Sequence, residues 1–382
     1  MAENIFLDRN WLSDYPVIFT RTLIRLGRNW PEMYVTGGAV RDWLRGEHPG
    51  DLDLTVAGDA PAAARLFAAA TGGAYILLDA DEGVARVVTQ GQGVDFSSFR
   101  EGTTDIVSDL ARRDFSINAM AVAVDPTTGT LAPPYLIIDP LGGAADLALG
   151  LVRAPAAAVF DSDPLRLLRA FRFASTLGLA IEEKTGQWIK SRRALIAKPS
   201  PERLRYELDL VMASPLAASV FVEMADFGLL AVIFPELFMG AGLVQPASHH
   251  LDVLGHNLAA LTAMAKLLRD PAAAYPDPEF AGYLALPARP ELLKWAALFH
   301  DLGKPETAAV KDDGRATFYN HDQAGARLFS ELAGRLRWSR ERSAIVARLI
   351  ELHMYPFHLN NAAQKTGIIP PGLSAAGQGR RR

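Results

Sequence analysis

Two hydrophobic patterns divide the chain. Between residues 33 and 150, short runs rich in β-branched and aromatic residues alternate with helical stretches, an arrangement typical of an α/β domain. The strand-like runs cover 34–36, 52–56, 74–78, 84–88 and 94–96, and one helical stretch covers 61–70. From residue 151 the strand signal is lost, and apolar residues recur at helical spacing in 164–179 and 202–212. The pattern predicts an α/β head with a mixed sheet and helices, followed by an all-α neck and a helical body.

The length supports several domains, because single hydrophobic cores rarely grow beyond about 250–300 residues and this chain has 382. We expect a head at 1–150, a neck at 151–215, a body at 216–360 and a disordered tail at 361–382. Ser214-Pro215 marks a helix boundary, and the Pro- and Ala-rich stretch 270–292 predicts a loop inside the body. The sequence contains no internal repeat.

Composition narrows the classes of protein and of site. The chain has no cysteine, so disulfides and thiolate metal sites are excluded, and a metal must bind to oxygen or imidazole. The N-terminal residues include acids and lack the basic and apolar segments of a signal peptide, and no apolar run approaches the roughly 20 residues of a membrane span. We expect a soluble cytoplasmic protein with no membrane partner. The sequence does not indicate an oligomeric state.

Basic residues are concentrated in the middle of a chain whose formal net charge is −4. RNA binding needs only a local basic surface, because phosphate contacts respond to charges within about a Debye length. The basic residues of this stretch are Arg166, Arg169, Arg172, Lys184, Lys190, Arg192, Arg193, Lys198, Arg203 and Arg205. Glutamates are interspersed among them, so an ordinary mixed-charge helical surface remains the alternative.

The segment GGAVRDWLRGEHPGDLDL carries the first chemical signal. A strand-like run leads into Gly37 and Gly38, where bare backbone N–H groups can cradle phosphate. The alternation around Asp51 and Asp53 suits a strand, and at a bent strand end both carboxylates can reach a metal. Mg²⁺ commonly takes some of its oxygen ligands from carboxylates and the others from a substrate triphosphate. A simple turn and a solvated strand end would explain either piece alone, but together they favour phosphate chemistry.

Three further motifs follow in order: RRDFSINAM at 112–120, IIDPLGGAADL at 137–147 and DPLRLLRAFRFASTLGL at 163–179. With the first segment they resemble the class II tRNA nucleotidyltransferase and bacterial poly(A) polymerase family. The resemblance implies a nucleotidyltransferase head that transfers nucleotides from CTP or ATP to the tRNA 3′ end and releases pyrophosphate. It also implies a two-metal mechanism that uses Mg²⁺.

Carried over motif by motif, the resemblance assigns the head residues. Asp51 and Asp53 would bind the Mg²⁺ ions, and Asp95, in a strand-like run, is our candidate for a third catalytic carboxylate. The remaining nucleotide contacts would be Gly38 and Arg41 in the phosphate cradle, with Arg112, Arg113, Asp114 and Asn118 at the triphosphate and ribose. The structural alternatives are a strand-end acid at Asp95 and a capped helix start at 112–118.

The motif at 163–179 places arginines every third residue, with an aspartate one step ahead, along one slowly turning helix face. A carboxylate can accept from a base's amino group while a guanidinium donates to a ring nitrogen or carbonyl. By resemblance, Asp163 and Arg166 would select CTP or ATP, and Arg169 and Arg172 would face phosphates or RNA. The alternative is a basic helix face. The family usually has Glu directly before this aspartate, where this chain has Ser162; the pairing needs only Asp163 and Arg166, so we expect selectivity to survive.

The stretch between Arg100 and Arg112 is short, EGTTDIVSDLA. The resemblance links a longer, mobile loop here to the switch from adding C to adding A, and a shortened one to enzymes that add two cytidines. We therefore favour CC addition. Full CCA addition, A-only addition and poly(A) synthesis remain alternatives, although the basic C-terminal extension associated with poly(A) polymerases is absent. Loop length also drifts freely on protein surfaces.

Seven of the eight histidines lie between residues 249 and 358. The residues His256, His300-Asp301, His321 and His353 resemble the HD phosphohydrolase pattern, and adjacent His-Asp can bind a divalent metal that activates water. A body that has lost this activity and serves as a tRNA scaffold is the alternative. One rival for the whole chain is an HD phosphohydrolase with a degenerate head, against which intact Asp51, Asp53 and Arg166 argue. A non-enzymatic RNA-binding scaffold is the other.

Overall fold

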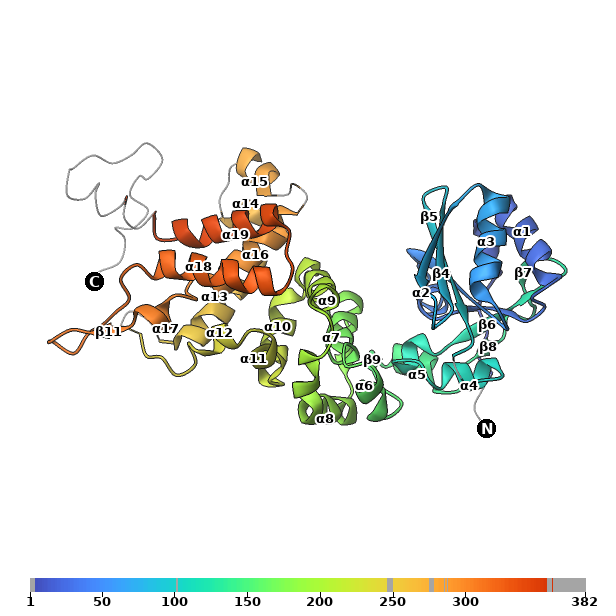
Figure 1. The fold of residues 1–382 in the computed structure, drawn as a ribbon, viewed down its shortest axis with the longest axis horizontal. Helices are drawn as coiled ribbons and strands as arrows, with labels where there is room; N and C mark the ends of the chain where they lie inside the picture. Colours follow the sequence, from blue (N-terminus) through green and yellow to red (C-terminus); the bar gives the residue numbers. More distant parts are fainter. Residues whose placement is uncertain are drawn as a thin grey trace. The chain divides into compact units, whose positions relative to one another are not determined.

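The computed structural model describes residues 4–100, 102–245, 250–274, 278–284, 286, 288–355 and 359. The chain forms two compact units, Met1–Arg192 and Arg193–Arg382, and the division falls inside the stretch predicted as the neck (Figure 1). The predicted disordered tail lies outside the described residues. Among the helices of the described part, none is long and apolar enough to cross a bilayer.

The first unit is built on a mixed sheet. Its strands are β1 (Met33–Thr36), β2 (Asp51–Val56), β3 (Ala74–Asp79), β4 (Val84–Thr89), β5 (Gln92–Ser98), β6 (Ala121–Asp125), β7 (Thr130–Leu131) and β8 (Ile137–Ile138). Their order is β3-β4-β5-β2-β1-β6-β7, with β8 also paired to β6. The β2–β5 pair is parallel and the other pairs are antiparallel. The predicted α/β head with a mixed sheet is confirmed, and β6 to β8 are strands the sequence pattern missed.

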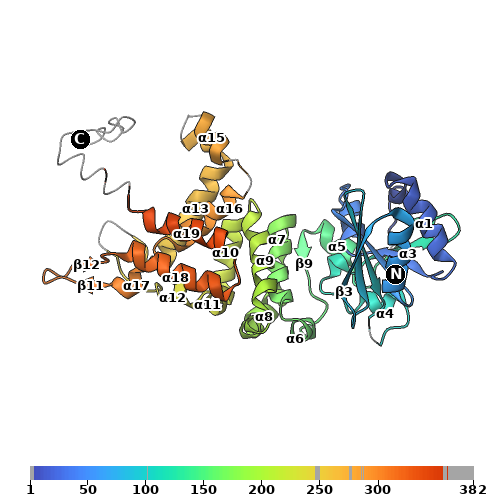
Figure 2. The same cartoon turned by 45° about the horizontal axis from the view of Figure 1, so that its top comes forward.

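Helices α1 (Val17–Gly27) and α3 (Ala60–Thr71) close one face of this sheet (Figure 2). Asp59 begins α3 by accepting a bond from the Ala62 N–H at 2.9 Å, and Gly72 ends it at φ 70°. Phe67 of α3 packs between Phe19 of α1 and Phe96 of β5, with ring centroids 5.1 and 5.4 Å away. This packing fixes the position of β5, the strand that carries Asp95.

Shorter elements complete the first unit. They are η1 (Trp11–Asp14), α2 (Gly38–Leu44), α4 (Ile106–Leu110), η2 (Ser116–Asn118), α5 (Gly143–Ala148), α6 (Ala158–Ser162), α7 (Arg166–Leu177), α8 (Glu183–Arg192) and the parallel pair β9 (Leu151–Val152) and β10 (Ala180–Ile181). Helix α7 begins later than the predicted 164, because Asp163 is extended at φ −138°. It ends at Gly178, in the left-handed conformation.

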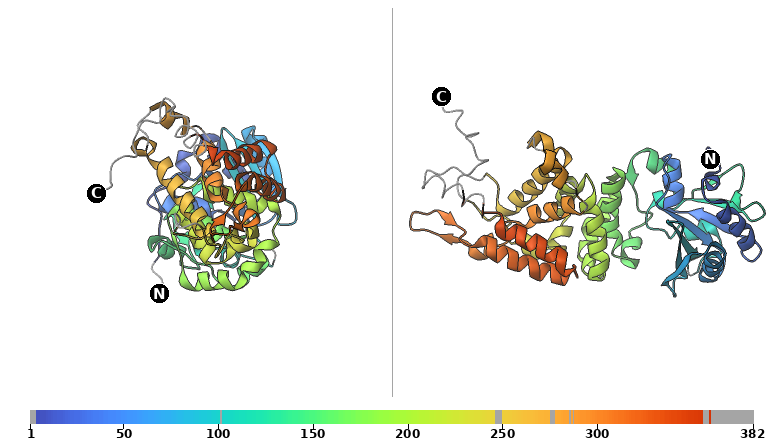
Figure 3. Two further views of the ribbon diagram at one scale, coloured as in Figure 1. Left: turned by 90° about the vertical axis from the view of Figure 1, so that its left-hand side faces the viewer. Right: turned by 90° about the horizontal axis from the view of Figure 1, so that it is seen from above.

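The second unit is helical, as predicted. Its helices are η3 (Arg193–Ala197), α9 (Pro201–Ala213), α10 (Ala217–Asp226), α11 (Leu229–Ile233), α12 (Pro235–Phe238), α13 (Val253–Arg269), α14 (Pro271–Ala274), α15 (Pro278–Leu284), α16 (Arg289–Phe299), α17 (Lys304–Thr307), α18 (His321–Arg335) and α19 (Arg340–Leu352), with one small hairpin of β11 (Ala309–Val310) and β12 (Ala316–Thr317). Helices α18 and α19, red in Figure 3, lie side by side. Trp295 of α16 is buried among Phe221, Phe234, Phe299 and Trp338.

Two boundary predictions in this unit differ in outcome. Helix α9 ends at Ala213, at the predicted Ser214-Pro215 boundary. The predicted loop at 270–292 is wrong, because this stretch holds α14, α15 and the start of α16. Proline is tolerated in the first helical turn, and both short helices begin with it.

Candidate active site

Three carboxylates lie together on neighbouring strands of the first unit. Asp51 and Asp53 are two residues apart on β2 and so point to the same face, which means that no bend in the strand is required. Asp95 of β5 is paired directly with Asp53 in the parallel register. The side chain of Asp51 is 43% exposed and that of Asp95 24%. The three predicted acids are therefore side by side at one place on the sheet.

Arg86 of β4 bridges two of these acids, and it was not predicted from the sequence. Its Nε and one terminal nitrogen each donate to Asp95 at 2.7 Å, and the same terminal nitrogen donates to Asp51 at 2.9 Å. Antiparallel pairing sets Arg86 directly opposite Asp95. A lone arginine in an otherwise apolar strand was the only available signal for it.

The glycine turn between β1 and α2 supports the third acid. Gly37 has φ 66°, which favours glycine, and the backbone N–H of Gly38 donates to Asp53 at 3.1 Å. Arg41, one turn along α2, donates to the side-chain oxygen of Asn118 at 2.7 Å and pairs with Asp42. The predicted phosphate cradle thus lies directly beside Asp53.

In the segment Arg112–Asp114, the first residue is exposed and the other two are buried. Arg113 is buried and donates to Asp109 and to the Thr55 hydroxyl, the latter at 3.0 Å. Asp114 pairs with Arg169 of α7 at 2.6 Å and accepts from Asn118 at 3.2 Å. These contacts tie the segment to both β2 and α7.

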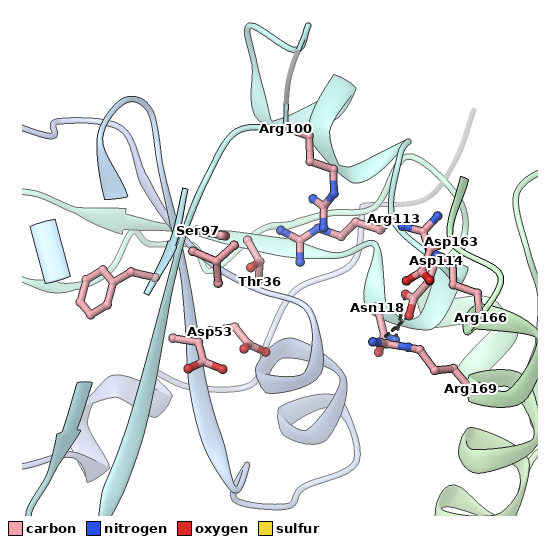
Figure 4. Close-up of a pocket in the computed structure, with 13 residues that line it drawn as sticks. Thr36, Asp53, Ser97, Arg100, Arg113, Asp114, Asn118, Asp163, Arg166 and Arg169 are labelled. Carbon is pink, nitrogen blue, oxygen red and sulfur yellow. Dashed lines mark hydrogen bonds and ion pairs between the residues drawn. The ribbon is translucent and has the colours of Figure 1, made fainter. Parts of the chain in front are cut away.

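A cavity of about 420 Å³ connects the acids to the α7 helix, a volume within the range of ligand sites (Figure 4). Its lining includes the predicted residues Asp53, Asp95, Arg113, Asp114, Asn118, Asp163, Arg166 and Arg169. Thr36, Ser97 and Arg100 also line it and were not predicted. The predicted residues Gly38, Arg41, Asp51, Arg112 and Arg172 are not among its lining; Arg112 is exposed, and the guanidinium of Arg172 lies 4.1 Å from the Phe173 ring.

The start of α7 places the pair expected to read the base. Asp163 precedes the helix, and one of its oxygens accepts the Leu165 N–H at 3.2 Å. Arg166 donates to the Val159 carbonyl and to the Ser162 hydroxyl, both at 3.3 Å. Ser162, the residue that departs from the family pattern, thus still contacts the predicted base-reading arginine.

Electrostatics distinguish the acids of this cavity. Burial, together with the charge of Asp95, raises the pKa of Asp53 to about 6. Burial alone would also raise the pKa of Asp114, but the charges of Arg169 and Arg166 and the hydrogen bonds from Asn118 and the Phe115 N–H together outweigh it and lower that pKa to about 2. The positive charge near Asp53 is therefore too small to offset its burial and the negative charge of Asp95. Hard oxygen donors in this state fit a divalent cation, which would lower the pKa of Asp53.

A second cluster lies in the helical unit and unites all five residues predicted for it. His256 lies in the first turn of α13, His300 and Asp301 follow α16, His321 begins α18 and His353 follows α19. One oxygen of Asp301 is 3.4 and 3.2 Å from Nε2 of His256 and His300, and the other is 3.2 and 3.6 Å from Nε2 of His321 and His353. The residues form two three-ligand groups that share Asp301 and could each hold a metal ion.

The histidine rings of this cluster are oriented by the backbone. Nδ1 of His300, His321 and His353 lies 2.9, 2.7 and 2.6 Å from the backbone carbonyl oxygen three residues earlier in the chain. These contacts turn Nε2 of each ring toward Asp301, and a metal ion bound there would take the Nε2 lone pair while the proton stays on Nδ1. Burial would raise the pKa of Asp301, but hydrogen bonds from the histidines lower it well below its usual range.

Lys304 and Gln245 join this cluster and were not predicted. The buried Lys304 ammonium lies 2.6 Å from Asp301 and donates to Gln245 at 2.6 Å. Gly303 lets α17 approach α18, because a Cβ there would lie 2.2 Å from the His321 carbonyl oxygen. The Leu-Gly-Lys sequence after His-Asp therefore has a packing and a charge role.

Comparison with known proteins identifies the class. Residues 33–153 match the poly A polymerase head domain, 178–239 the probable RNA- and SrmB-binding site of polymerase A, and 253–371 the HD domain. An A-adding tRNA nucleotidyltransferase of Deinococcus radiodurans is 36% identical over 338 residues, which are 87% of this chain and 71% of that protein. A CC-adding enzyme of Thermus thermophilus is 31% identical over 329 residues, 85% of this chain and 68% of that protein.

A solved structure supports the fold. A CCA-adding enzyme in complex with CTP aligns with TM-score 0.64 and 21% identity, over 96% of this chain and 77% of that one. The fold and the matched domains define a nucleotidyltransferase head joined to an HD-type helical domain. The chain belongs to the tRNA nucleotidyltransferase family, which contains CC-adding, A-adding and CCA-adding enzymes.

Proposed function

We propose that this protein transfers cytidylyl groups from CTP to the 3′ end of tRNA, adding two cytidines and releasing pyrophosphate. The observation that carries the proposal is the cavity that joins the carboxylates of β2 and β5 to Asp163 and Arg166 at the start of α7. One end of this cavity suits the reacting phosphate, and the other offers an acceptor and a donor to a base edge. The names of the relatives support tRNA as the acceptor. The proposed location is then the cytoplasm.

Asp51 and Asp53 are the proposed Mg²⁺ ligands, with Asp95 beside them. When bound, Mg²⁺ neutralises triphosphate charge and favours the deprotonated form of the attacking 3′-hydroxyl. Gly38 holds the Asp53 carboxylate in place through its N–H. Arg113 and Arg169 add positive charge to the cavity wall, where the triphosphate and ribose would lie. These residues position the nucleotide, which is the main protein contribution to phosphoryl transfer.

Base selection is proposed for Asp163 and Arg166. A carboxylate accepts from the exocyclic amino group that cytosine and adenine share, and a guanidinium donates to the adjacent ring nitrogen. Arg166 is already oriented by the Val159 carbonyl and the Ser162 hydroxyl. Burial lowers the pKa of this arginine from its ordinary value, with no consequence near neutral pH. An oriented guanidinium loses less entropy on binding a base.

The restriction to cytidine rests on the short segment between Arg100 and Arg113. Both arginines bond to the fully buried carboxylate of Asp109, Arg100 at 2.9 Å and Arg113 at 3.1 Å. The backbone N–H of Arg100 adds a bond to Asp109 at 3.0 Å. Both ends of the segment are therefore bonded to Asp109. A segment held in this way supports a fixed nucleotide specificity over a change from adding C to adding A. A-addition is the second candidate, because the Deinococcus relative is an A-adding enzyme.

The proposed reaction can be tested by measuring tRNA-dependent pyrophosphate release from CTP and Mg²⁺. Asp51→Asn and Asp53→Asn should each reduce the rate at least a hundredfold, because each removes a metal ligand. Asp81→Asn, which changes an exposed carboxylate of the same unit, is the matched control and should retain the wild-type rate. Full activity in both ligand variants would show that these acids do not carry the reaction.

A second activity is proposed for the helical unit, where the His and Asp side chains around Asp301 converge. A divalent metal bound there would supply an activated water for phosphoester hydrolysis. One group, His256, His300 and Asp301, or the other, Asp301, His321 and His353, would hold it through Nε2 and carboxylate oxygen, and Lys304 would offer its charge to the phosphate. Hydrolysis of bis(p-nitrophenyl) phosphate with Mn²⁺, Co²⁺ or Ni²⁺ tests it. Asp301→Ala should abolish that hydrolysis and leave pyrophosphate release from CTP unchanged; no hydrolysis by the wild-type protein with any of these metals would refute it.

A further inference from the structure

We propose that Arg86 serves as a built-in cation at the nucleotidyl-transfer site, holding Asp51 and Asp95 together in the empty enzyme and yielding Asp51 when the metal–nucleotide arrives. Arg86 is then a positioning residue that suppresses binding of free divalent cations. The inference rests on the proposed role of Asp51 and Asp53 as metal ligands. It goes beyond that role because it assigns a function to a residue on a different strand.

The geometry of the guanidinium supports this role. Arg86 makes two parallel bonds to Asp95, both 2.7 Å, which is the strong bidentate arrangement of an arginine and a carboxylate. Its third bond, to Asp51 at 2.9 Å, is single. The Asp51 contact is therefore the weaker one and the first to be released, while Asp95 keeps the arginine in place.

Asp51 is also positioned for release. Its side chain is 43% exposed, against 24% for Asp95, so a cation arriving from solvent reaches it more readily. Its other oxygen lies against Gly93 of β5, where a Cβ would come within 2.1 Å. Glycine at 93 thus leaves room for this carboxylate, and in this arrangement Arg86 is the side chain that holds it.

The positive groups around the three carboxylates determine how a cation can bind. Asp53 has the Gly38 N–H and the charge of the buried Arg113 nearby, whereas Asp51 and Asp95 have Arg86. With Arg86 present, a free cation must displace an arginine from Asp51. A cation that arrives on a triphosphate brings its own phosphate ligands and overcomes this competition. Without Arg86, three carboxylates would attract a free cation strongly and repel a metal-free triphosphate.

The test measures two affinities in the full-length protein without tRNA. Mn²⁺ binding is followed by electron paramagnetic resonance of the free ion. The Mn²⁺ binding that Asp53→Asn abolishes is assigned to the head, and the remainder to the His and Asp cluster of the helical unit. Binding of CTP is measured by calorimetry in EDTA. The variants are Arg86→Gln, Arg86→Lys and, as the matched loss of one exposed positive charge, Arg25→Met.

Arg86→Gln should bind Mn²⁺ at least tenfold more tightly than wild type and bind metal-free CTP at least threefold more weakly. Both affinities of Arg86→Lys should lie between those of wild type and Arg86→Gln. Both affinities of Arg25→Met should stay within twofold of wild type. Unchanged or weaker Mn²⁺ binding in Arg86→Gln would overturn the inference, because a purely structural residue would weaken both affinities. If Arg86→Gln does not fold, Arg86→Lys decides: Mn²⁺ binding no tighter than wild type contradicts the proposal.

Failure of the proposed function has a different signature. In that case wild-type protein shows no Mn²⁺ binding that depends on Asp53, even with CTP present, and both proposals fall. If this component exists in wild type but does not strengthen in Arg86→Gln, only the role of Arg86 is lost.

Discussion

The Asp114–Arg169 pair joins the RRD segment to α7, and Asp114→Asn tests its strength. The pKa of Asp114 is lowered from 3.8 to about 2, which corresponds to about 2.5 kcal/mol at roughly 1.4 kcal/mol per pKa unit. A third of the Arg169 side chain is exposed, so solvent screening reduces the expected contribution to about 2 kcal/mol. Asparagine keeps an acceptor for the Phe115 N–H and for Asn118, so the variant removes mainly the charge.

The dependence on pH has a definite sign. Because the folded-state pKa of Asp114 is depressed, its contribution is fully present above about pH 4 and is lost as pH falls toward 2. The destabilisation of Asp114→Asn should therefore be equal at pH 7 and pH 5, and smaller at pH 3. Arg169 would also lose its anchor in the cavity, so the KM for CTP should rise.

The measurement is urea unfolding of the full chain at these three pH values. Pulsed hydrogen exchange of peptides from β2 and β5 reports the first unit separately from the second. Asp81→Asn is the control, since that carboxylate is exposed in the same unit, and should change stability by less than about 0.5 kcal/mol. A cost below that limit for Asp114→Asn at pH 7, or a cost that grows on acidification, would refute the reasoning.

Three further predictions test other parts of the structure. Gly93→Ala should lower the rate of cytidine addition at least tenfold in steady-state kinetics, because a Cβ there would displace Asp51; an unchanged rate would contradict this placement. Lys294→Met should destabilise the second unit by about 2–4 kcal/mol in urea unfolding, because the buried ammonium donates to two carbonyl oxygens at the end of α9. Mn²⁺ should raise the thermal midpoint of the second unit in wild type but not in Asp301→Ala, since only a folded cluster binds it; equal shifts in both proteins would place the metal elsewhere.

The head was predictable to the extent that its strands are short, β-rich and separated by turn residues. The predicted runs at 52–56 and 94–96 match β2 and β5, which places Asp53 and Asp95 on strands. Their adjacency could not be predicted, because it depends on the parallel pairing of β2 with β5, which are distant in sequence. Strands β6 to β8 were missed, since two of them are only two residues long.

The unpredicted site residues share a physical cause. Arg86 and Arg100 act through ion pairs with acids from other elements, and such pairs leave no periodic trace in sequence. Lys304 pairs with Asp301 only three residues earlier, but its burial beside that acid depends on the packing of the helices. The helical cluster was predictable because His-Asp is an adjacent pair. The Pro- and Ala-rich stretch was wrongly predicted as a loop, because proline is common both in loops and in the first helical turn.

The most direct test of the central claim is the length of the product. Purified protein, Mg²⁺ and tRNA that lacks its 3′ end are incubated with CTP alone, ATP alone or both, and the products are resolved at single-nucleotide length. We expect two additions with CTP and no third when ATP is also supplied. A third addition would contradict the fixed specificity assigned to the short segment between Arg100 and Arg113. Extension only with ATP, on tRNA that already ends in CC, would identify an A-adding enzyme instead.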